Sequence, residues 1–381
     1  MHVPDGFIDV PVSVATGVVA AGAVAVSLRG ARRELDERTA PLAGLVAAFI
    51  FAVQMLNFPV AAGTSGHLLG GALAAILVGP YTGVLCIAVV LLMQGILFAD
   101  GGLTALGVNI TVMGVVTTVV SYLLFRGLVR ILPRTRRSVT VSTFVAALVS
   151  VPAAAAAFTL IYAIGGTTDI PIGRVLTAMV GVHVLIGIGE AAITALTVGA
   201  VIAVRPDLVY GARGLSRPLK LRVGGELVDA RPAVSAGPSG APGTSGGRGA
   251  AGVSGSPAAP VAARSTRTIW ATGLVTALVV AGFLSFYASA SPDGLEKVAA
   301  DQGIDEKAQP HHSADSPLAD YAITEISDAR ISGGVAGVIG VGATVVVGSG
   351  VFYAVRRRRT SGGSGSAGSG SAGIAAAGRS V

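Results

Sequence analysis

The amino-acid sequence predicts an all-α integral membrane protein, built as a seven-helix bundle followed by a two-helix C-terminal membrane unit. Of the 381 residues, 52% are hydrophobic and 12% are charged, and the mean hydropathy is +0.74. A soluble domain of this length cannot bury so large a fraction of apolar residues in its core. Apolar runs near the length of about 20 residues that crosses a bilayer as a helix recur along the sequence. Nine can be counted, at residues 9–28, 42–60, 68–78, 84–98, 103–131, 139–164, 175–204, 268–288 and 333–355.

The residues between the runs explain where each run ends. A glycine-rich stretch separates the second run from the third, and irregular backbone is tolerated at membrane depth where protein surrounds it. Gly79-Pro80 ends the third run, and the sequence Ala-Asp-Gly-Gly at 99–102 ends the fourth. Pro152 lies inside the sixth run, where neighbouring helices can satisfy the carbonyl that it frees.

The distribution of basic residues predicts the orientation of the runs. Arginines cluster after the first, fifth and last runs, and Arg205 ends the seventh. Because short loops rich in Lys and Arg stay in the cytoplasm, we expect a multi-pass protein of the cell (plasma) membrane with an extracytoplasmic N-terminus and a cytoplasmic C-terminus. The first basic residue, Arg29, follows the first apolar run, so no secretory signal peptide is expected.

Composition divides the chain into four parts. Residues 1–210 hold the seven-span unit, and residues 211–266 are rich in Pro, Gly and Ser, as in a flexible cytoplasmic linker. Residues 267–356 form the two-span unit with an acidic extracytoplasmic loop, and residues 357–381 form a disordered Ser/Gly/Ala tail. The acidic loop could concentrate cations, although a solvated loop is the simpler interpretation.

Charge and cysteine content exclude several classes of protein. The net charge of +7 does not indicate a nucleic-acid partner, because the basic residues lie in short loops between spans. The lone Cys86 lies in an apolar run, so no disulfide framework exists. The chain contains no Gly-x-x-x-x-Gly-Lys-Ser/Thr phosphate loop, so it does not hydrolyse ATP by that machinery.

Nitrogen donors at the start of the chain and in the glycine-rich stretch 61–71 predict a metal site. The amino group of Met1, the backbone nitrogen of His2 and the His2 imidazole can chelate one ion in fused rings, and His67 could close the square. An α-amino group has a pKa near 7.7 to 8.0, so a metal ion can displace its proton at neutral pH. A planar nitrogen set suits Ni(II), Co(II) or Cu(II), whereas structural zinc prefers a tetrahedral set.

Other polar residues within the apolar runs are candidates for supporting this site. Burying such groups unsatisfied is costly, so each carries a presumption of function. His183 and Glu190 are seven residues apart and share one face of the seventh run. They could pair with each other, or they could orient a metal-ligating residue without touching the metal ion themselves, and both alternatives stay open. Asn109 and Gln94 could orient the site as well, although packing is the commoner role.

Four blocks in the first 210 residues resemble the substrate-binding membrane subunit of cobalt and nickel energy-coupling-factor (ECF) transporters, the CbiM/NikM family. They are MHVPDGFID at the start, GTSGHLLGGALAAILVGPYTG around residues 64–83, MQGILFADGGLTALGVNITVMG at 93–114 and HVLIGIGEAAITAL at 183–196. The C-terminal unit, with SPDGLEKVAADQG at 291–303 and SPLADY at 316–321, is similar to the PDGLE domain that accompanies such subunits.

The resemblance implies a bundle like the substrate-binding component of ECF transporters and a substrate-capture subunit that is not an enzyme. The family's ligand pattern falls on Met1, through its α-amino nitrogen, and on His2 and His67. No catalytic cofactor is expected, because Co(II) or Ni(II) is the transported substrate. The implied partners are a transmembrane coupling subunit and cytoplasmic ABC ATPase subunits, in a setting of membrane lipid. The PDGLE loop is expected near the entrance of the site.

Two alternatives belong to other functional classes. The sequence Gly63-Thr64-Ser65-Gly66 matches the G-x-S-G serine motif of rhomboid intramembrane proteases, with Ser65 as nucleophile and His183 as base. The motif is short in a chain with 54 glycines, and it leaves the N-terminus and the second unit unexplained. A stand-alone metal permease would need a continuous polar path, which few intramembrane ionisable residues could build.

Overall fold

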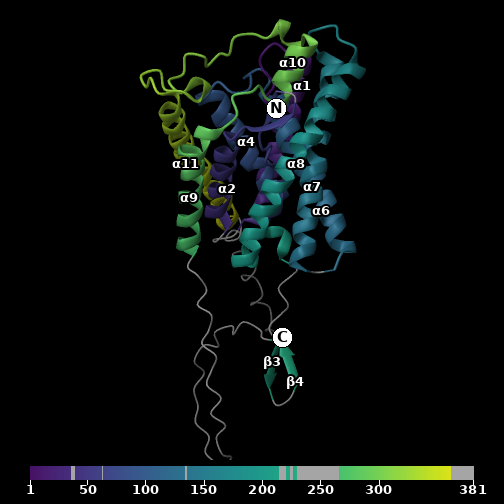
Figure 1. Ribbon diagram of the computed structural model, residues 1–381. Helices are drawn as coiled ribbons and strands as arrows, with labels where there is room; N and C mark the ends of the chain where they lie inside the picture. Colours follow the sequence, from purple (N-terminus) through teal and green to yellow (C-terminus); the bar gives the residue numbers. More distant parts are fainter. Residues whose placement is uncertain are drawn as a thin grey trace, which may run out of the picture.

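The computed structural model describes residues 1–35, 39–61, 63–133, 135–213, 220–223, 226–229 and 266–361, and nearly all of its secondary structure is helical (Figure 1). Among the described residues, seven helices are long and apolar enough to cross a membrane. The expected all-α architecture is confirmed. Most of the expected linker 211–266 and of the expected tail 357–381 lies outside the described residues.

The helices and strands of residues 1–210 are α1 Val10–Glu34, α2 Thr39–Gln54, β1 Phe58–Ala61, β2 Thr64–Gly66, α3 Gly71–Val78, α4 Pro80–Leu97, α5 Leu106–Asn109, α6 Thr117–Ile131, α7 Arg136–Gly165 and α8 Ile172–Val204. They are followed by β3 Lys220–Val223, β4 Glu226–Asp229, α9 Thr266–Gly282, α10 Gly294–Gln302 and α11 Ala329–Ser361.

The second and third runs are shorter as helices than the sequence suggests. The second run, expected to span at residues 42–60, is helical only to Gln54, and the chain then turns into the antiparallel pair β1 and β2. Helix α3 begins at Gly71, after a non-helical stretch that contains His67, and it ends after eight residues. Pro59 lies in β1, and Gly63 and Gly70 have positive φ angles of 73° and 87°, which favour glycine. These residues interrupt the helices although the stretch is apolar.

The fifth run is one continuous apolar helix of mixed type. It begins at Leu106, passes through a π-helical segment, Ile110–Val116, and continues as α6 to Ile131. π-Helical turns inside α-helices are rare and are frequent at functional sites. Asn109, a residue expected to support the site, lies directly before the π-helical segment.

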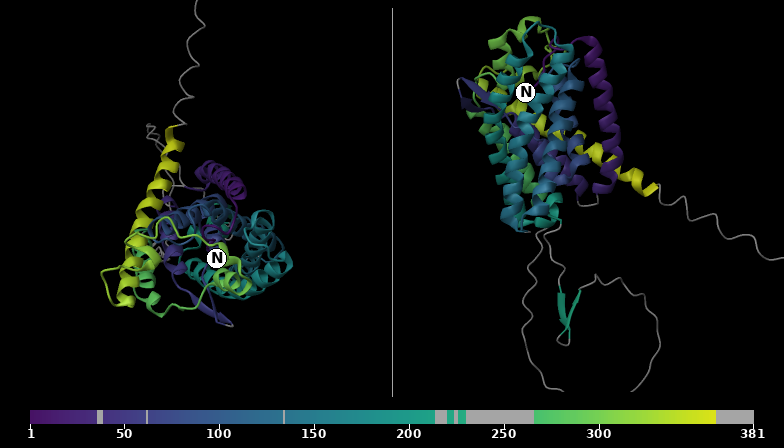
Figure 2. Two further views of the ribbon diagram at one scale, coloured as in Figure 1. Left: turned by 90° about the horizontal axis from the view of Figure 1, so that it is seen from above. Right: turned by 90° about the vertical axis from the view of Figure 1, so that its right-hand side faces the viewer.

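The two helices of the C-terminal unit pack against the first unit along α2. Seen from above, α9 and α11 lie together along one side of the bundle (Figure 2). Glycines allow the close approach: a Cβ atom on Gly340 of α11 would lie 2.2 Å from Cζ of Phe51 in α2. Gly44 of α2 similarly faces Ser349 of α11. Small residues at helix contacts in membranes let backbones approach closely, so both units share one apolar core.

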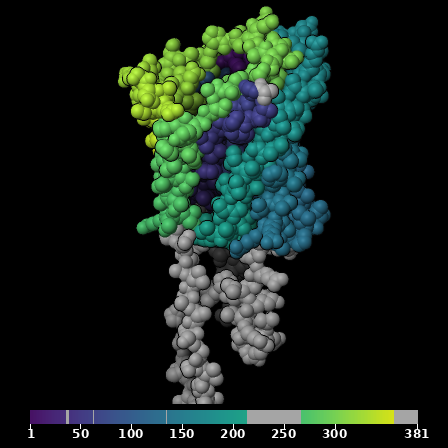
Figure 3. Space-filling view, in the orientation of Figure 1, coloured from purple at the N-terminus to yellow at the C-terminus, as the bar shows by residue number. Residues whose placement is uncertain are grey.

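The segment between α9 and α11 covers the end of the bundle at which the N-terminus lies (Figure 1). Backbone hydrogen bonds hold it there: Ser289 N donates to Asn57 O at 2.7 Å, Gln309 N to Asp5 O at 2.9 Å, and Asp320 N to Phe98 O at 2.9 Å. Figure 3 shows N-terminal atoms in a hollow framed by this segment. The two units therefore meet over the N-terminus.

The packing of α11 on α2 predicts that Gly340→Ala destabilises the fold. The added methyl group meets the fully buried ring of Phe51, and overpacking of this kind costs roughly 1–3 kcal/mol. We expect a lower midpoint of thermal unfolding for the purified protein in detergent. The matched control is Gly342→Ala in the same helix, where an added Cβ meets nothing within 4 Å. Equal midpoints for the two variants would contradict the proposed contact.

Candidate metal centre

The first residues of the chain lie buried inside the end of the bundle. Met1 and Val3 are 2% and 1% exposed. The side-chain amide of Asn109 pairs with the Val3 backbone: Val3 N donates to Asn109 Oδ1 at 2.8 Å, and Asn109 Nδ2 donates to Val3 O at 3.2 Å. The buried carboxylate of Asp5 accepts a hydrogen bond from Thr104 N at 2.8 Å. These contacts fix the position of the terminal amino group.

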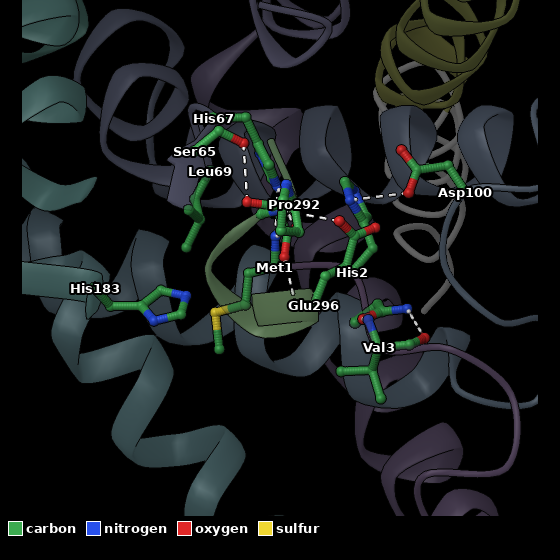
Figure 4. Close-up of polar contacts among 12 residues, drawn as sticks. Met1, His2, Val3, Ser65, His67, Leu69, Asp100, His183, Pro292 and Glu296 are labelled. Carbon is green, nitrogen blue, oxygen red and sulfur yellow. Dashed lines mark hydrogen bonds and ion pairs between the residues drawn. The ribbon is translucent and has the colours of Figure 1, made fainter. Parts of the chain in front are cut away.

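The amino group of Met1 contacts His67 (Figure 4). It also contacts Asp293. Its nitrogen is in hydrogen-bond contact with His67 Nε2 and lies 2.6 Å from Asp293 Oδ2. The other ring nitrogen of His67, Nδ1, lies 3.0 Å from the carbonyl oxygen of Leu68. We assign the proton to Nδ1, which donates to this carbonyl, so the Nε2 lone pair points at the amino group. This tautomer is the one that a metal ligand requires.

His2 stacks on His67, with ring centroids 5.0 Å apart and an interplanar angle of 14°. Its Nε2 lies 3.2 Å from Gln94 Oε1 and its Nδ1 lies 3.1 Å from Asp100 Oδ1. Burial lowers the pKa of His2 to about 4, so the imidazole is neutral at neutral pH. A neutral imidazole carries one N–H, and it can donate to only one of these two oxygens.

Tyr321 contacts both residues that carry these oxygens. Its hydroxyl donates to Asp100 Oδ2 at 2.6 Å and accepts from Gln94 Nε2 at 3.0 Å, which turns Gln94 Oε1 toward His2. Burial raises the pKa of Tyr321 well above its usual value, so the hydroxyl keeps its proton. Because a carboxylate is a stronger acceptor than an amide oxygen, we assign the single proton of His2 to Nδ1, which donates to Asp100.

Asp293 comes from the C-terminal unit, at the N-cap of α10. Asp293 Oδ1 accepts from Glu296 N at 2.8 Å, and Glu296 Oε2 accepts from Asp293 N at 2.9 Å, which together form a capping box. Burial opposes ionisation of Asp293, but the Met1 amino group and His67 outweigh it and hold the pKa of the carboxyl well below its usual range. One ligand atom each from His2, His67 and Asp293 lies within 4.8 Å of the others.

Glu190 holds the loop that carries His67. Its two carboxylate oxygens accept hydrogen bonds from Leu69 N at 2.7 Å and Gly70 N at 3.1 Å, directly before α3. His183 donates within its own helix, from Nδ1 to Met179 O at 2.7 Å, and its buried Nε2 has no hydrogen-bond partner among the described residues. The pairing of His183 with Glu190, one of the two alternatives from the sequence, is therefore not found.

Ser65 ties β2 to the C-terminal unit. Its hydroxyl donates to Ser291 O at 2.7 Å and its backbone nitrogen donates to Pro292 O at 2.8 Å. The serine hydroxyl thus donates its hydrogen bond to a main-chain carbonyl, and the His183 ring donates a hydrogen bond to a carbonyl of its own helix. The serine and histidine of the protease alternative do not form a nucleophile–base pair, and that alternative has no support.

A cavity of about 540 Å³ opens above the cluster, in line with the hollow in Figure 3. Carboxylates and imidazoles line it, and it reaches the His2 and His67 rings from the side covered by the C-terminal unit. Its polar lining includes His2, Asp5, His67, Asp100, Asp293 and His311. The site is therefore open to a small cation.

Asp293 is the residue of this cluster that the sequence did not single out. It was one of nine carboxylates in the acidic loop. Its Asp-Gly-Leu-Glu sequence fits a capping box and could have located the start of α10. No local pattern could have shown that α10 begins beside Met1 and His67. The expectation that this loop lies near the site entrance agrees with its position.

Comparison with known proteins identifies both parts of the chain. Residues 2–208 match the CbiM family, described as a cobalt uptake substrate-specific transmembrane region. Residues 267–357 match the PDGLE domain. Both matches confirm the resemblance that the sequence blocks carry.

Individual relatives match the first part of the chain. A putative metal transport protein of Haloquadratum walsbyi is 40% identical over 210 residues, covering 55% of this chain and 94% of the relative. A putative fused nickel transport protein of Archaeoglobus fulgidus is 40% identical over 214 residues, covering 55% of this chain and 68% of the relative. A solved crystal structure of a transition metal transporter is 26% identical, with a TM-score of 0.49, covering 54% of this chain and 93% of its own. Because the family model covers more than half of the chain and a relative is 40% identical over 94% of its length, the chain belongs to the CbiM family of cobalt uptake transmembrane proteins. It carries a PDGLE domain after the family region.

Proposed function

We propose that this multi-pass membrane protein is the metal-capturing subunit of an ATP-driven ECF-type importer of Co(II) or Ni(II). One observation carries the proposal: the amino group of Met1 and the imidazoles of His2 and His67 meet at the floor of a polar cavity. The names of its relatives, which include cobalt and nickel transport proteins, support the choice of metals.

The ligand set proposed for the ion is the α-amino nitrogen of Met1, the nitrogens of His2 and Nε2 of His67. The proton on His67 Nδ1 leaves the Nε2 lone pair directed toward the Met1 amino group. Nitrogen donors in a tetragonal arrangement suit Ni(II), and imidazole suits several late divalent metals. The ion itself is the substrate, so the protein needs no catalytic cofactor and acts as a transport subunit.

Asn109 and Glu190 are proposed as positioning residues. Asn109 holds the backbone beside His2, and Glu190 holds the backbone beside His67, so neither needs to touch the ion. Such supporting partners typically contribute 10–100-fold to metal affinity in other proteins. His183 lies close to Gly294 at the start of α10, where a Cβ atom would come 3.1 Å from His183 Cε1. We propose that His183 supports the contact between α8 and α10.

Energy for import is proposed to come from partner subunits. The sequence contains no phosphate loop, so a transmembrane coupling subunit and cytoplasmic ABC ATPases would drive inward release. In this proposal the N-terminus and the cavity face the outside of the cell membrane, and the arginine-rich loops face the cytoplasm.

Blocking the Met1 amino group or removing the His67 imidazole tests the proposed nitrogen ligands. One extra residue before Met1, or His67→Ala, should weaken binding of Ni(II) and Co(II) by more than the roughly 10–100-fold that loss of a supporting partner costs. Binding is measured by calorimetric titration of the purified protein, after mass spectrometry has established its N-terminal residue. The control is His312→Ala, which removes an exposed imidazole from the C-terminal unit. Unchanged affinity in the extended protein would exclude the amino group as a ligand.

The second prediction separates positioning from stability. Glu190→Gln leaves one acceptor for two backbone N–H groups, so we expect metal affinity to fall roughly 10-fold or more. Glu34→Gln is the matched control. Glu34 is also a buried glutamate that accepts from two backbone nitrogens, Tyr81 N and Thr82 N in the first turn of α4. It lies at the end of α1, remote from the site. If both variants lost affinity equally, Glu190 would have only a structural role.

The third prediction concerns the source of energy. In lipid vesicles, uptake of radioactive nickel or cobalt should require the coupling subunit, the ATPase subunits and ATP together. The protein alone should bind the ion without accumulating it. Uptake by the protein alone would support the stand-alone permease and contradict the importer.

A further inference from the structure

The C-terminal unit contributes a charged side chain to the metal cluster, and nothing in the proposed nitrogen set accounts for it. Asp293 is 7% exposed, and its Oδ2 lies 2.6 Å from Met1 N and 3.4 Å from His67 Nε2. The nearest nitrogens are therefore the two that the proposed function assigns to the ion. A carboxylate oxygen at this place lies within the reach of any ion that those nitrogens bind.

The position of Asp293 is fixed by contacts on both sides. The preceding Ser291 and Pro292 accept hydrogen bonds from Ser65, two residues before His67. The following Gly294 packs against α8 so closely that a Cβ atom would come 2.6 Å from Cδ1 of Ile186. The backbones that carry His67 and Asp293 are thus joined directly, and the carboxylate is held at the cluster before any ion arrives.

The two oxygens of Asp293 have separate tasks. Oδ1 caps α10 by accepting from Glu296 N, whereas Oδ2 points into the cluster. An ion held by the amine, the two imidazoles and the deprotonated backbone nitrogen of His2 would keep one net positive charge in a buried site, which is costly without a compensating anion. Asp293 supplies that negative charge at contact distance.

We propose that Asp293 Oδ2 is an oxygen ligand of the bound Co(II) or Ni(II), so that both units of the chain together form the metal site. This inference rests on the proposed function, because it takes the nitrogen set from there. It adds a fifth donor to the four nitrogens and makes the docked PDGLE unit part of the coordination shell. A hard carboxylate oxygen also favours divalent ions over Cu(I), which prefers soft sulfur ligands.

The test uses the full-length protein with two substitutions that keep the helix cap. Asn and Ser are both good N-cap residues, so Asp293→Asn and Asp293→Ser preserve the start of α10 while removing the carboxylate. The matched control is Asp305→Asn, which removes an exposed carboxylate of the same segment. Thermal unfolding and size-exclusion profiles check that each variant is folded.

The expected result is a loss of affinity together with a change in the ion's spectrum. Ni(II) affinity should fall at least roughly 10-fold in both Asp293 variants, since loss of even a supporting partner costs 10–100-fold. Ni(II) with four planar nitrogens is diamagnetic, whereas an added oxygen ligand makes it paramagnetic. Wild-type protein and Asp305→Asn should hold paramagnetic Ni(II), and the Asp293 variants should hold the diamagnetic planar form, seen by magnetic susceptibility and visible absorption.

Two outcomes overturn the proposal. If the Asp293 variants bind Ni(II) and Co(II) with wild-type affinity and spectra, Asp293 does not ligate the ion. If they bind more tightly, Asp293 competes with the ion for the Met1 amino group. In either case, loss of binding in His67→Ala leaves the proposed function standing. Retention of binding in both His67→Ala and the N-terminally extended protein contradicts the proposed function itself.

Discussion

The buried amino group of Met1 is the constraint on which the rest of the site depends. A charge taken out of water is costly unless it is paired and hydrogen-bonded, and Met1 is 2% exposed. Its partners are His67 and Asp293, and Asp293 lies 292 residues further along the chain. The fold must therefore bring together the N-terminal segment, the loop before α3 and the start of α10. Asn109 and Glu190 satisfy the backbones of the first two, and the capping box with Glu296 fixes the third.

Close packing of helices places the C-terminal unit over this cluster. Glycines let α11 approach α2, with Gly340 at the ring of Phe51 and Gly44 at Ser349. Within a membrane, helices gain little from hydrophobic exclusion of water, so such tight van der Waals contact decides how they associate. The segment between α9 and α11 then bonds to the first unit through main-chain groups at Asn57, Asp5 and Phe98. The pairing of the two units thus rests on many contacts that contain no metal.

The sequence predicted the helical architecture well because hydropathy reports directly on membrane helices. It was less successful where apolar residues are not helical: Pro59, Gly63 and Gly70 end α2 early and delay α3. Met1, His2 and His67 could be proposed because their donor atoms and their motif are local. Asp293 could not, because nine carboxylates share its loop and only tertiary packing distinguishes one of them. The roles of Glu190 and His183 were left open for the same reason, since one helix face does not reveal what lies opposite.

The C-terminal unit also contacts the groups that surround His2. Tyr321 of the C-terminal unit donates to Asp100 and accepts from Gln94, and these two residues face the two ring nitrogens of His2. The carboxylate is the stronger acceptor, so the single proton of His2 lies on Nδ1 and donates to Asp100. Tyr321 and its neighbour Asp320 both have positive φ angles, which L-residues adopt at a cost. The C-terminal unit thus adopts a costly backbone conformation at the point where the Tyr321 hydroxyl contacts both residues that hold the His2 ring.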